Sequence, residues 1–145
     1  MRNYLWAVAF WLTSTMAAAD GVTDNNNVVL NGYDVVAYFT IDEAVKGSKD
    51  YTYDWKGLTF WFSSKEHQEL FNANPEKYAP QFNGHCANGL SDGHVVDGNP
   101  IYWRVIDDKL YVFYSYWGRT QWAFNVEEQV ELAWATFNAH DRGEH

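Results

Sequence analysis

The segment QFNGHCANGLS, residues 81–91, holds the single cysteine of the chain, Cys86, directly after His85. A thiolate and an imidazole are good ligands for copper or zinc. Gly84 and Gly89 would let the backbone bend closely around an ion. Because two adjacent ligands rarely hold a metal, further ligands would have to come from elsewhere in the fold. The segment therefore predicts one part of a soft-metal site.

Two other histidines are candidates for the remaining ligands. His67 lies in SSKEHQELFNANPEKY, where it shares a helix face with Leu70 and Phe71 by spacing of three and four residues. Since Leu70 and Phe71 should face the core, His67 should point inward as well. His94 follows Cys86 in the polar segment SDGHVVDG. The predicted metal ligands are thus Cys86, His85 and His67, with His94 as an additional candidate.

Cys86 also has two metal-free interpretations. It could be a small buried apolar residue that starts a helical turn, with His85 exposed or hydrogen-bonded. It could instead be a nucleophile, since a neighbouring imidazole can activate a thiol. Adjacent side chains tend to point apart, however, which makes His85 a poor base for Cys86. The sequence favours a protein that is not an enzyme.

The aromatic residues form a second candidate site. The chain is 19% aromatic, with eight Trp, ten Tyr and nine Phe, and its lone cysteine cannot form an intramolecular disulfide. Burial of rings must therefore stabilise the fold. Trp55, Trp61, Trp103 and Trp117 lie on predicted strands and should mostly be core. One or two exposed rings could still stack on a sugar or an apolar ligand.

The N-terminal segment has the order of a secretory signal. Arg2 precedes an apolar run from Tyr4 to Leu12, and small residues follow up to Ala19. We expect a signal peptide over residues 1–19 and export to the periplasm, although a retained N-terminal anchor is an alternative. Residues 20–27, DGVTDNNN, read as a flexible leader. With a net charge of −9 the protein should repel nucleic acid and, once cleaved, anionic membrane surfaces.

The remaining chain, residues 28–140, reads as one small α+β domain without an internal repeat. Its pattern predicts two β-hairpins packed with a central helix and a C-terminal helix. Ser63 and Glu66 are spaced as a capping box at the start of the central helix. The expected elements are a strand over 28–30, a hairpin over 51–62 turning at Lys56-Gly57, a helix from Ser63, a short helix from Pro75, a hairpin over 101–115 turning at Asp107-Asp108, and a helix over 125–140.

Four segments in this order resemble the secreted bacterial YHS-domain family: LNGYDVVAYF, AVKGS, YTYDWKGLTFWFSSKEHQELFNANPEKYAPQFNGHCA and VVDGNPIYWRVIDDKLYVFYS. The family is similar to TRASH-like metal-associated modules, which occur beside heavy-metal transport ATPases and in some metal-dependent oxygenases. This resemblance implies metal ligands near the opening turn and at the strand-to-helix junction. Ser63 and Ser64 stand where a thiolate would be expected, whereas His85 stands where secreted members usually have an aromatic residue.

These observations lead to one main hypothesis and one alternative. The main hypothesis is an exported, non-enzymatic, metal-associated domain that binds copper first and zinc second through Cys86, His85 and His67. The alternative is a metal-free periplasmic module in which Cys86 is part of the core. An aromatic groove would then bind a small ligand or a periplasmic protein partner.

Overall fold

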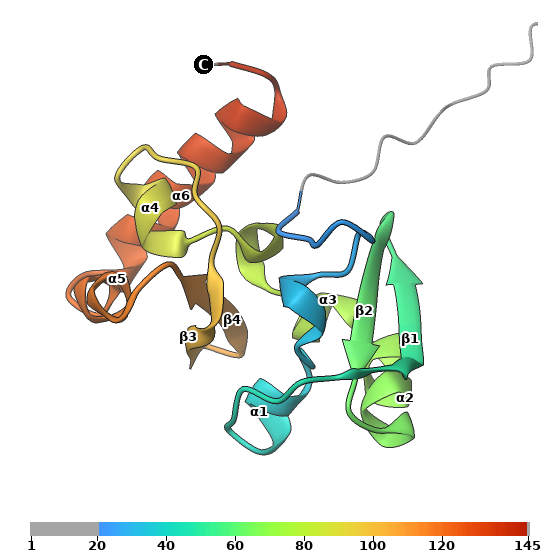
Figure 1. Ribbon diagram of the computed structural model, residues 1–145. Coiled ribbons are helices and arrows are strands. Elements are labelled where there is room, and N and C mark those ends of the chain that lie inside the picture. The colour runs from blue at the N-terminus through green and yellow to red at the C-terminus, as the bar shows by residue number, and fades with distance from the viewer. Residues whose placement is uncertain (1–20, 145) are drawn as a thin grey trace, which may run out of the picture.

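The computed structural model describes residues 21–144, so the predicted signal peptide, residues 1–19, lies outside the described residues. The fold is α+β, as expected (Figure 1). None of the helices described between residues 21 and 144 has the length and apolar character needed to cross a membrane. The elements in chain order are η1 (Leu30–Gly32), α1 (Ala37–Thr40), β1 (Ser48–Trp55), β2 (Leu58–Phe62), α2 (Lys65–Ala73), α3 (Pro75–Tyr78), η2 (Gln81–Gly84), α4 (Ala87–Ser91), β3 (Asn99–Ile106), β4 (Lys109–Phe113), α5 (Tyr116–Trp122) and α6 (Val126–Asp141).

Both predicted hairpins are confirmed, with the predicted turns. β1 pairs with β2, and β3 with β4, each in antiparallel fashion. The first turn has Lys56 at φ 50° and Gly57 at φ 77°, and the second has Asp107 at φ 51° and Asp108 at φ 58°. Two consecutive positive φ values are what a two-residue hairpin turn needs to match the twist of its strands.

The opening of the domain differs from the expectation. Residues 28–30 form isolated bridges and a 3-10 turn rather than a strand, because Leu30 (φ 49°) and Asn31 (φ 55°) leave the extended region. Residues 21–27 are not a separate leader. Val22 is only 8% exposed, and its N–H donates to the carbonyl of Asn83 at 2.9 Å. These residues are therefore part of the domain.

The helices differ from the sequence-based expectation at three places, the first of which is the short helix α1, for which no element is expected. The cap of α2 is Ser64, which accepts from the N–H of His67, and not Ser63. The helix α5 was not expected, and it carries Trp117 on its surface at 68% exposure instead of on a buried strand. The helix break before Pro75 and the C-terminal helix α6 are confirmed.

The two hairpins are the centres of two halves that repeat one backbone path, a feature that the sequence analysis missed. Each half has a 3-10 turn, a short helix, a hairpin and a serine-capped helix. Each hairpin has an irregularity at the same place in its register. Corresponding cross-strand pairs are Ser48–Phe62 with Asn99–Phe113, Thr52–Trp61 with Trp103–Val112, and Trp55–Leu58 with Ile106–Lys109.

Two equivalent glycines show how closely the halves correspond. A Cβ on Gly47 would lie 2.6 Å from the carbonyl carbon of Trp61, and a Cβ on Gly98 would lie 2.5 Å from Cγ2 of Val112. Trp61 and Val112 occupy equivalent register positions. At both places the loop before the hairpin crosses the second strand so closely that only glycine fits.

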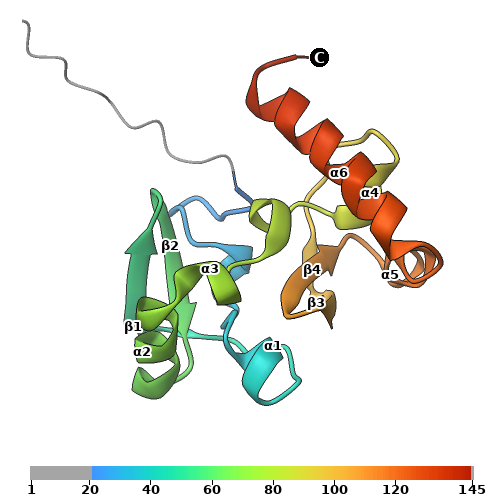
Figure 2. The same ribbon diagram turned by 180° about the vertical axis from the view of Figure 1, so that it is seen from behind.

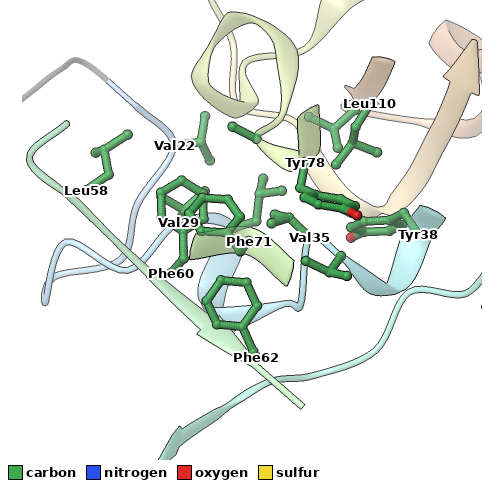
Figure 3. Packing of buried hydrophobic residues seen from close by; sticks show 14 residues of the cluster. Val22, Val29, Val35, Tyr38, Leu58, Phe60, Phe62, Phe71, Tyr78 and Leu110 are labelled. Carbon is green, nitrogen blue, oxygen red and sulfur yellow. The ribbon is translucent and has the colours of Figure 1, made fainter. Parts of the chain in front are cut away.

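The core of the first half is a cluster of rings around Phe71 of α2. Its ring centroid lies 4.5 Å from that of Phe60 and 5.1 Å from that of Phe62, both on β2. Figure 3 shows these three rings together, with Val29 and Val35 from the opening segment beside them. All five residues are at most 2% exposed, so the helix, the hairpin and the opening segment share one apolar core.

Strand β4 joins the two cores, because both of its faces are buried. Leu110 and Val112 on one face belong to the cluster around Phe71, whereas Tyr111 and Phe113 on the other face pack in a second cluster. Trp122 of α5 lies 5.3 Å from Tyr111 and 5.8 Å from Phe113 between ring centroids, and is fully buried. Successive side chains of a β-strand point to opposite faces, so β4 contributes to both cores and joins the two halves into one domain.

Helix α6 has no counterpart in the first half. It lies along α4 in both views (Figures 1 and 2) and contributes Ala133 to the second cluster. Val126, Val130 and Phe137 pack against the same cluster, so these apolar residues form the buried face of the helix. Trp134 of the same helix is 38% exposed.

We predict that Phe71→Ala and Trp122→Ala destabilise the protein to a similar extent, because these residues occupy equivalent places in the two cores. Each change should cost about 3–5 kcal/mol of unfolding free energy, the usual range for removing a buried large ring. Urea unfolding followed by far-UV circular dichroism measures it. A loss below about 1 kcal/mol for either variant would contradict the two-core description.

Candidate functional site

The first group of polar side chains surrounds Asp34, which is fully buried. Its Oδ1 accepts from the N–H groups of Val36 at 2.9 Å and Ala37 at 3.2 Å. Its Oδ2 accepts from the N–H of Ser63 at 2.9 Å and the hydroxyl of Ser63 at 2.6 Å. Nδ1 of His67 lies 2.6 Å from the same oxygen. The carboxylate therefore fixes the opening segment to the end of the first hairpin.

His67 points inward, as the sequence predicts, but toward Asp34. Its Nε2 lies 3.1 Å from the hydroxyl of Thr40. The order hydroxyl, imidazole, carboxylate is the one in which a histidine can act as a base. Neither the cavity nor the groove described below is lined by any of these three residues. The contacts of His67 with Asp34 and Thr40 join α2 to the opening segment and support a positioning role in the fold.

Cys86 occupies in the second half the place that Asp34 occupies in the first. Its Sγ accepts from the N–H of Gly89 at 3.4 Å and from the N–H of Tyr114 at 3.1 Å. These donors correspond to Ala37 and Ser63 in the first half. Cys86 is 3% exposed and is the N-cap of α4. The interpretation of Cys86 as a buried residue that starts a helical turn is thus supported by its surroundings.

The other candidate ligands lie apart from one another. His85 is 5% exposed, and its ring centroid lies 6.2 Å from those of Phe137 and His140 on α6. His94 is exposed in the loop after α4. His67 belongs to α2, on the opposite side of the molecule from α4 (Figures 1 and 2). Within residues 21–144 no three His, Cys, Asp or Glu side chains gather in a group that could hold a metal ion.

An apolar cavity of about 280 Å³ lies between the first hairpin and α6. Trp55, Leu58 and Phe60 come from the hairpin, and Trp134 and Phe137 from the helix. Its full lining, which also includes residues of α3 and η2, is Val29, Trp55, Lys56, Leu58, Phe60, Glu76, Ala79, Pro80, Gln81, Phe82, Asn83, Trp134 and Phe137. This hollow can take an apolar molecule.

Sequence reasoning missed Asp34, Thr40 and His140. The first could have been found from the two segments Asn-Gly-Tyr-Asp and Asn-Gly-His-Cys, each of which precedes a predicted hairpin. That correspondence aligns Asp34 with Cys86. Nothing in the sequence brings His140 to His85, because their proximity depends on how α6 packs across the second half.

Comparisons with models of known protein families, with curated proteins and with solved structures find no match to this chain.

We predict that Asp34→Asn lowers the unfolding free energy by about 3 kcal/mol, since an amide nitrogen in place of Oδ2 cannot accept from Ser63 and leaves buried donors unsatisfied. Thr40→Val should change it by less than about 0.5 kcal/mol, because Thr40 is exposed. Urea unfolding of both variants measures the difference. Equal stability of Asp34→Asn and the wild type would contradict the proposed role of the carboxylate.

For Cys86 we predict no alkylation by iodoacetamide in the native protein, with or without a chelator, because the thiol is buried and accepts two backbone N–H groups. Labelling should appear only in denaturant. Mass spectrometry of the intact chain measures the modification. Labelling that begins when chelator is added to the native protein would instead indicate a metal-bound thiolate.

Copper or zinc binding through Cys86, His85, His67 and His94 stays a proposal with its own measurement. Anaerobic titration with copper(I), and with zinc(II), should show near-stoichiometric uptake that Cys86→Ser abolishes if the sequence-based hypothesis holds. Weak metal uptake that is equal in the wild type and in Cys86→Ser would contradict the metal-binding hypothesis.

Proposed function

We propose that the protein is a non-enzymatic binding module that takes a small apolar molecule of one or two rings in the cavity between β1–β2 and α6. The observation that carries this proposal is the cavity itself, whose walls are mainly aromatic and aliphatic. Its volume of about 280 Å³ is near the lower end of the range for small-molecule sites, roughly 300–1,000 Å³. The proposal corresponds to the metal-free alternative from the sequence.

The aromatic walls have geometry suited to ring contacts. Phe82 lies 4.6 Å from Trp134, and Trp134 lies 5.6 Å from Phe137, between ring centroids. On the facing wall, Trp55 and Phe60 lie 6.3 Å apart in a tilted arrangement. Rings at such distances can hold a further ring in an edge-to-face or offset contact.

A few polar groups at the edge of the cavity can orient the ligand. The ammonium of Lys56 lies 4.5 Å from the centroid of the Trp55 ring, and Glu76 and Gln81 line the cavity from α3 and η2. A mainly apolar lining with a small number of polar groups is typical of small-molecule sites. A ligand with an apolar body and one polar substituent matches this arrangement.

The rest of the hypothesis from the sequence is compatible with this function. Export to the periplasm and membership of the YHS-domain family remain part of the proposal, and the second depends on motifs such as NGYD and NPEKY. In this proposal the thiol of Cys86 is a structural acceptor, because two backbone N–H groups already donate to it.

The test is a fluorescence titration with 2-naphthol, a two-ring molecule with one hydroxyl. We expect saturable binding to the wild type with Kd of about 0.1 mM, a value in keeping with the efficiency of small ligands. Trp134→Ala should weaken binding about tenfold, because it removes one wall of the cavity.

Trp117→Ala is the matched control, since Trp117 is 68% exposed and does not line the cavity. It should bind 2-naphthol like the wild type. If Trp117→Ala weakens binding as much as Trp134→Ala does, or if the wild type shows no saturation, the proposed function is wrong.

A further inference from the structure

A second hollow, the open groove, lies on the surface between the two halves and shares no lining residue with the apolar cavity. Its volume of about 1140 Å³ exceeds the range typical of drug-sized ligands, roughly 300–1,000 Å³. An extended ligand therefore suits it better than a compact one. It is lined by Val22, Thr23, Asp24, Asn31, Tyr33, Lys46, Trp61, Asp97, Gly98, Asn99, Pro100, Ile101, Tyr102, Tyr114 and Ser115.

Four aromatic residues from different segments line this groove. Tyr33, Trp61 and Tyr102 are half-buried, and Tyr114 is 69% exposed. A half-buried ring keeps one side packed and leaves part of its surface to solvent. Rings in that state are suited to stacking on a flat ligand face.

Carboxylate, amide and ammonium groups lie among these rings. Asn31, Lys46 and Asp97 are exposed, and Asn99 is half-buried. The side-chain oxygen of Asn99 accepts from the N–H of Ile101 at 3.1 Å, and the NH₂ group of the same amide is a hydrogen-bond donor. A carboxylate accepts hydrogen bonds, and an amide both donates and accepts them, so together they can bind neighbouring hydroxyl groups of a ligand.

The comparison of the two halves shows that the fold does not need the ring of Tyr114, the most exposed ring of the groove. Tyr114 is equivalent to Ser63, and each gives its backbone N–H to the buried acceptor of its own half. Ser63 also binds Asp34 through its hydroxyl, whereas the ring of Tyr114 extends into solvent. The scaffold therefore requires only the backbone at this position.

The irregular part of β3 brings further residues to the groove. The register shift between Asn99 and Trp103 places Pro100, Ile101 and Tyr102 along it. The hydroxyl of the buried Tyr38 donates to the carbonyl of Pro100 at 2.7 Å, and burial raises the pKa of this phenol, so it stays a donor. Bulges re-aim side chains next to binding sites in many proteins.

We propose that the open groove binds a neutral oligosaccharide. Aromatic faces would stack on the C–H faces of the sugar rings, and Asp97, Asn31 and Asn99 would bind their hydroxyl groups. The lining of the groove has two acidic residues, Asp24 and Asp97, and one basic residue, Lys46. Together with the net charge of −9 of the whole protein, this makes the groove a poor site for an anionic glycan.

The experiment is an NMR titration of the ¹⁵N-labelled protein with cellohexaose, chitohexaose and maltohexaose. We expect at least one of these neutral hexasaccharides to shift groove resonances with Kd of roughly 1 mM or below. Tyr114→Ala and Asp97→Ala should each weaken that binding at least fivefold. Both variants should keep the wild-type affinity for 2-naphthol, which separates this proposal from the proposed function of the cavity.

Tyr116→Ala is the matched control, because Tyr116 is 64% exposed, lies close to Tyr114 in the chain and does not line the groove. It should bind the hexasaccharide like the wild type. Proline-rich peptides also bind in aromatic-lined grooves, and a decaproline peptide tests for that class of ligand. Absence of shifts with all three sugars, binding of decaproline in their place, or equal losses in Tyr114→Ala and Tyr116→Ala would each overturn the proposal.

Discussion

The architecture depends on one buried hydrogen-bond acceptor at the start of each half. In the first half it is the carboxylate of Asp34, and in the second it is the thiol of Cys86. Each accepts an N–H from the short helix that follows it and an N–H from the end of the hairpin in its own half. Because a buried N–H without an acceptor is costly, this single side chain holds three chain segments together.

The two acceptors differ in chemistry, and the surrounding structure differs accordingly. A buried carboxylate needs several donors, and Asp34 has the hydroxyl of Ser63 and the imidazole of His67 in addition to backbone N–H groups. A thiol is a weaker hydrogen-bond acceptor than a carboxylate and needs fewer donors when it is buried. The position equivalent to His67 in the second half can therefore be Gly118, which has no side chain. The histidine that looked like a metal ligand in the sequence thus has a clear structural partner.

Both proposed binding surfaces lie where the two halves differ. The apolar cavity exists because α6 is present only in the second half and places Trp134 and Phe137 opposite the first hairpin. The open groove is aromatic because Tyr114 replaces the serine of the first half and because Trp61 stands where the second half has the fully buried Val112. In both proposals the side chains that are not repeated between the halves supply the recognition.

The sequence alone determined the two hairpins, their turns, the breaks before Pro75 and the C-terminal helix, because turn residues, caps and apolar spacing act over a few neighbouring positions. In the sequence the repeat is marked by little more than the shared Asn-Gly of NGYD and NGHC, because equivalent positions such as Asp34 and Cys86 have the same structural role with different residues. The sequence also could not bring His67 to Asp34, or Trp134 to Phe82. Those contacts join segments far apart in the chain, and only the packing of both faces of β4 and the docking of α6 decide them.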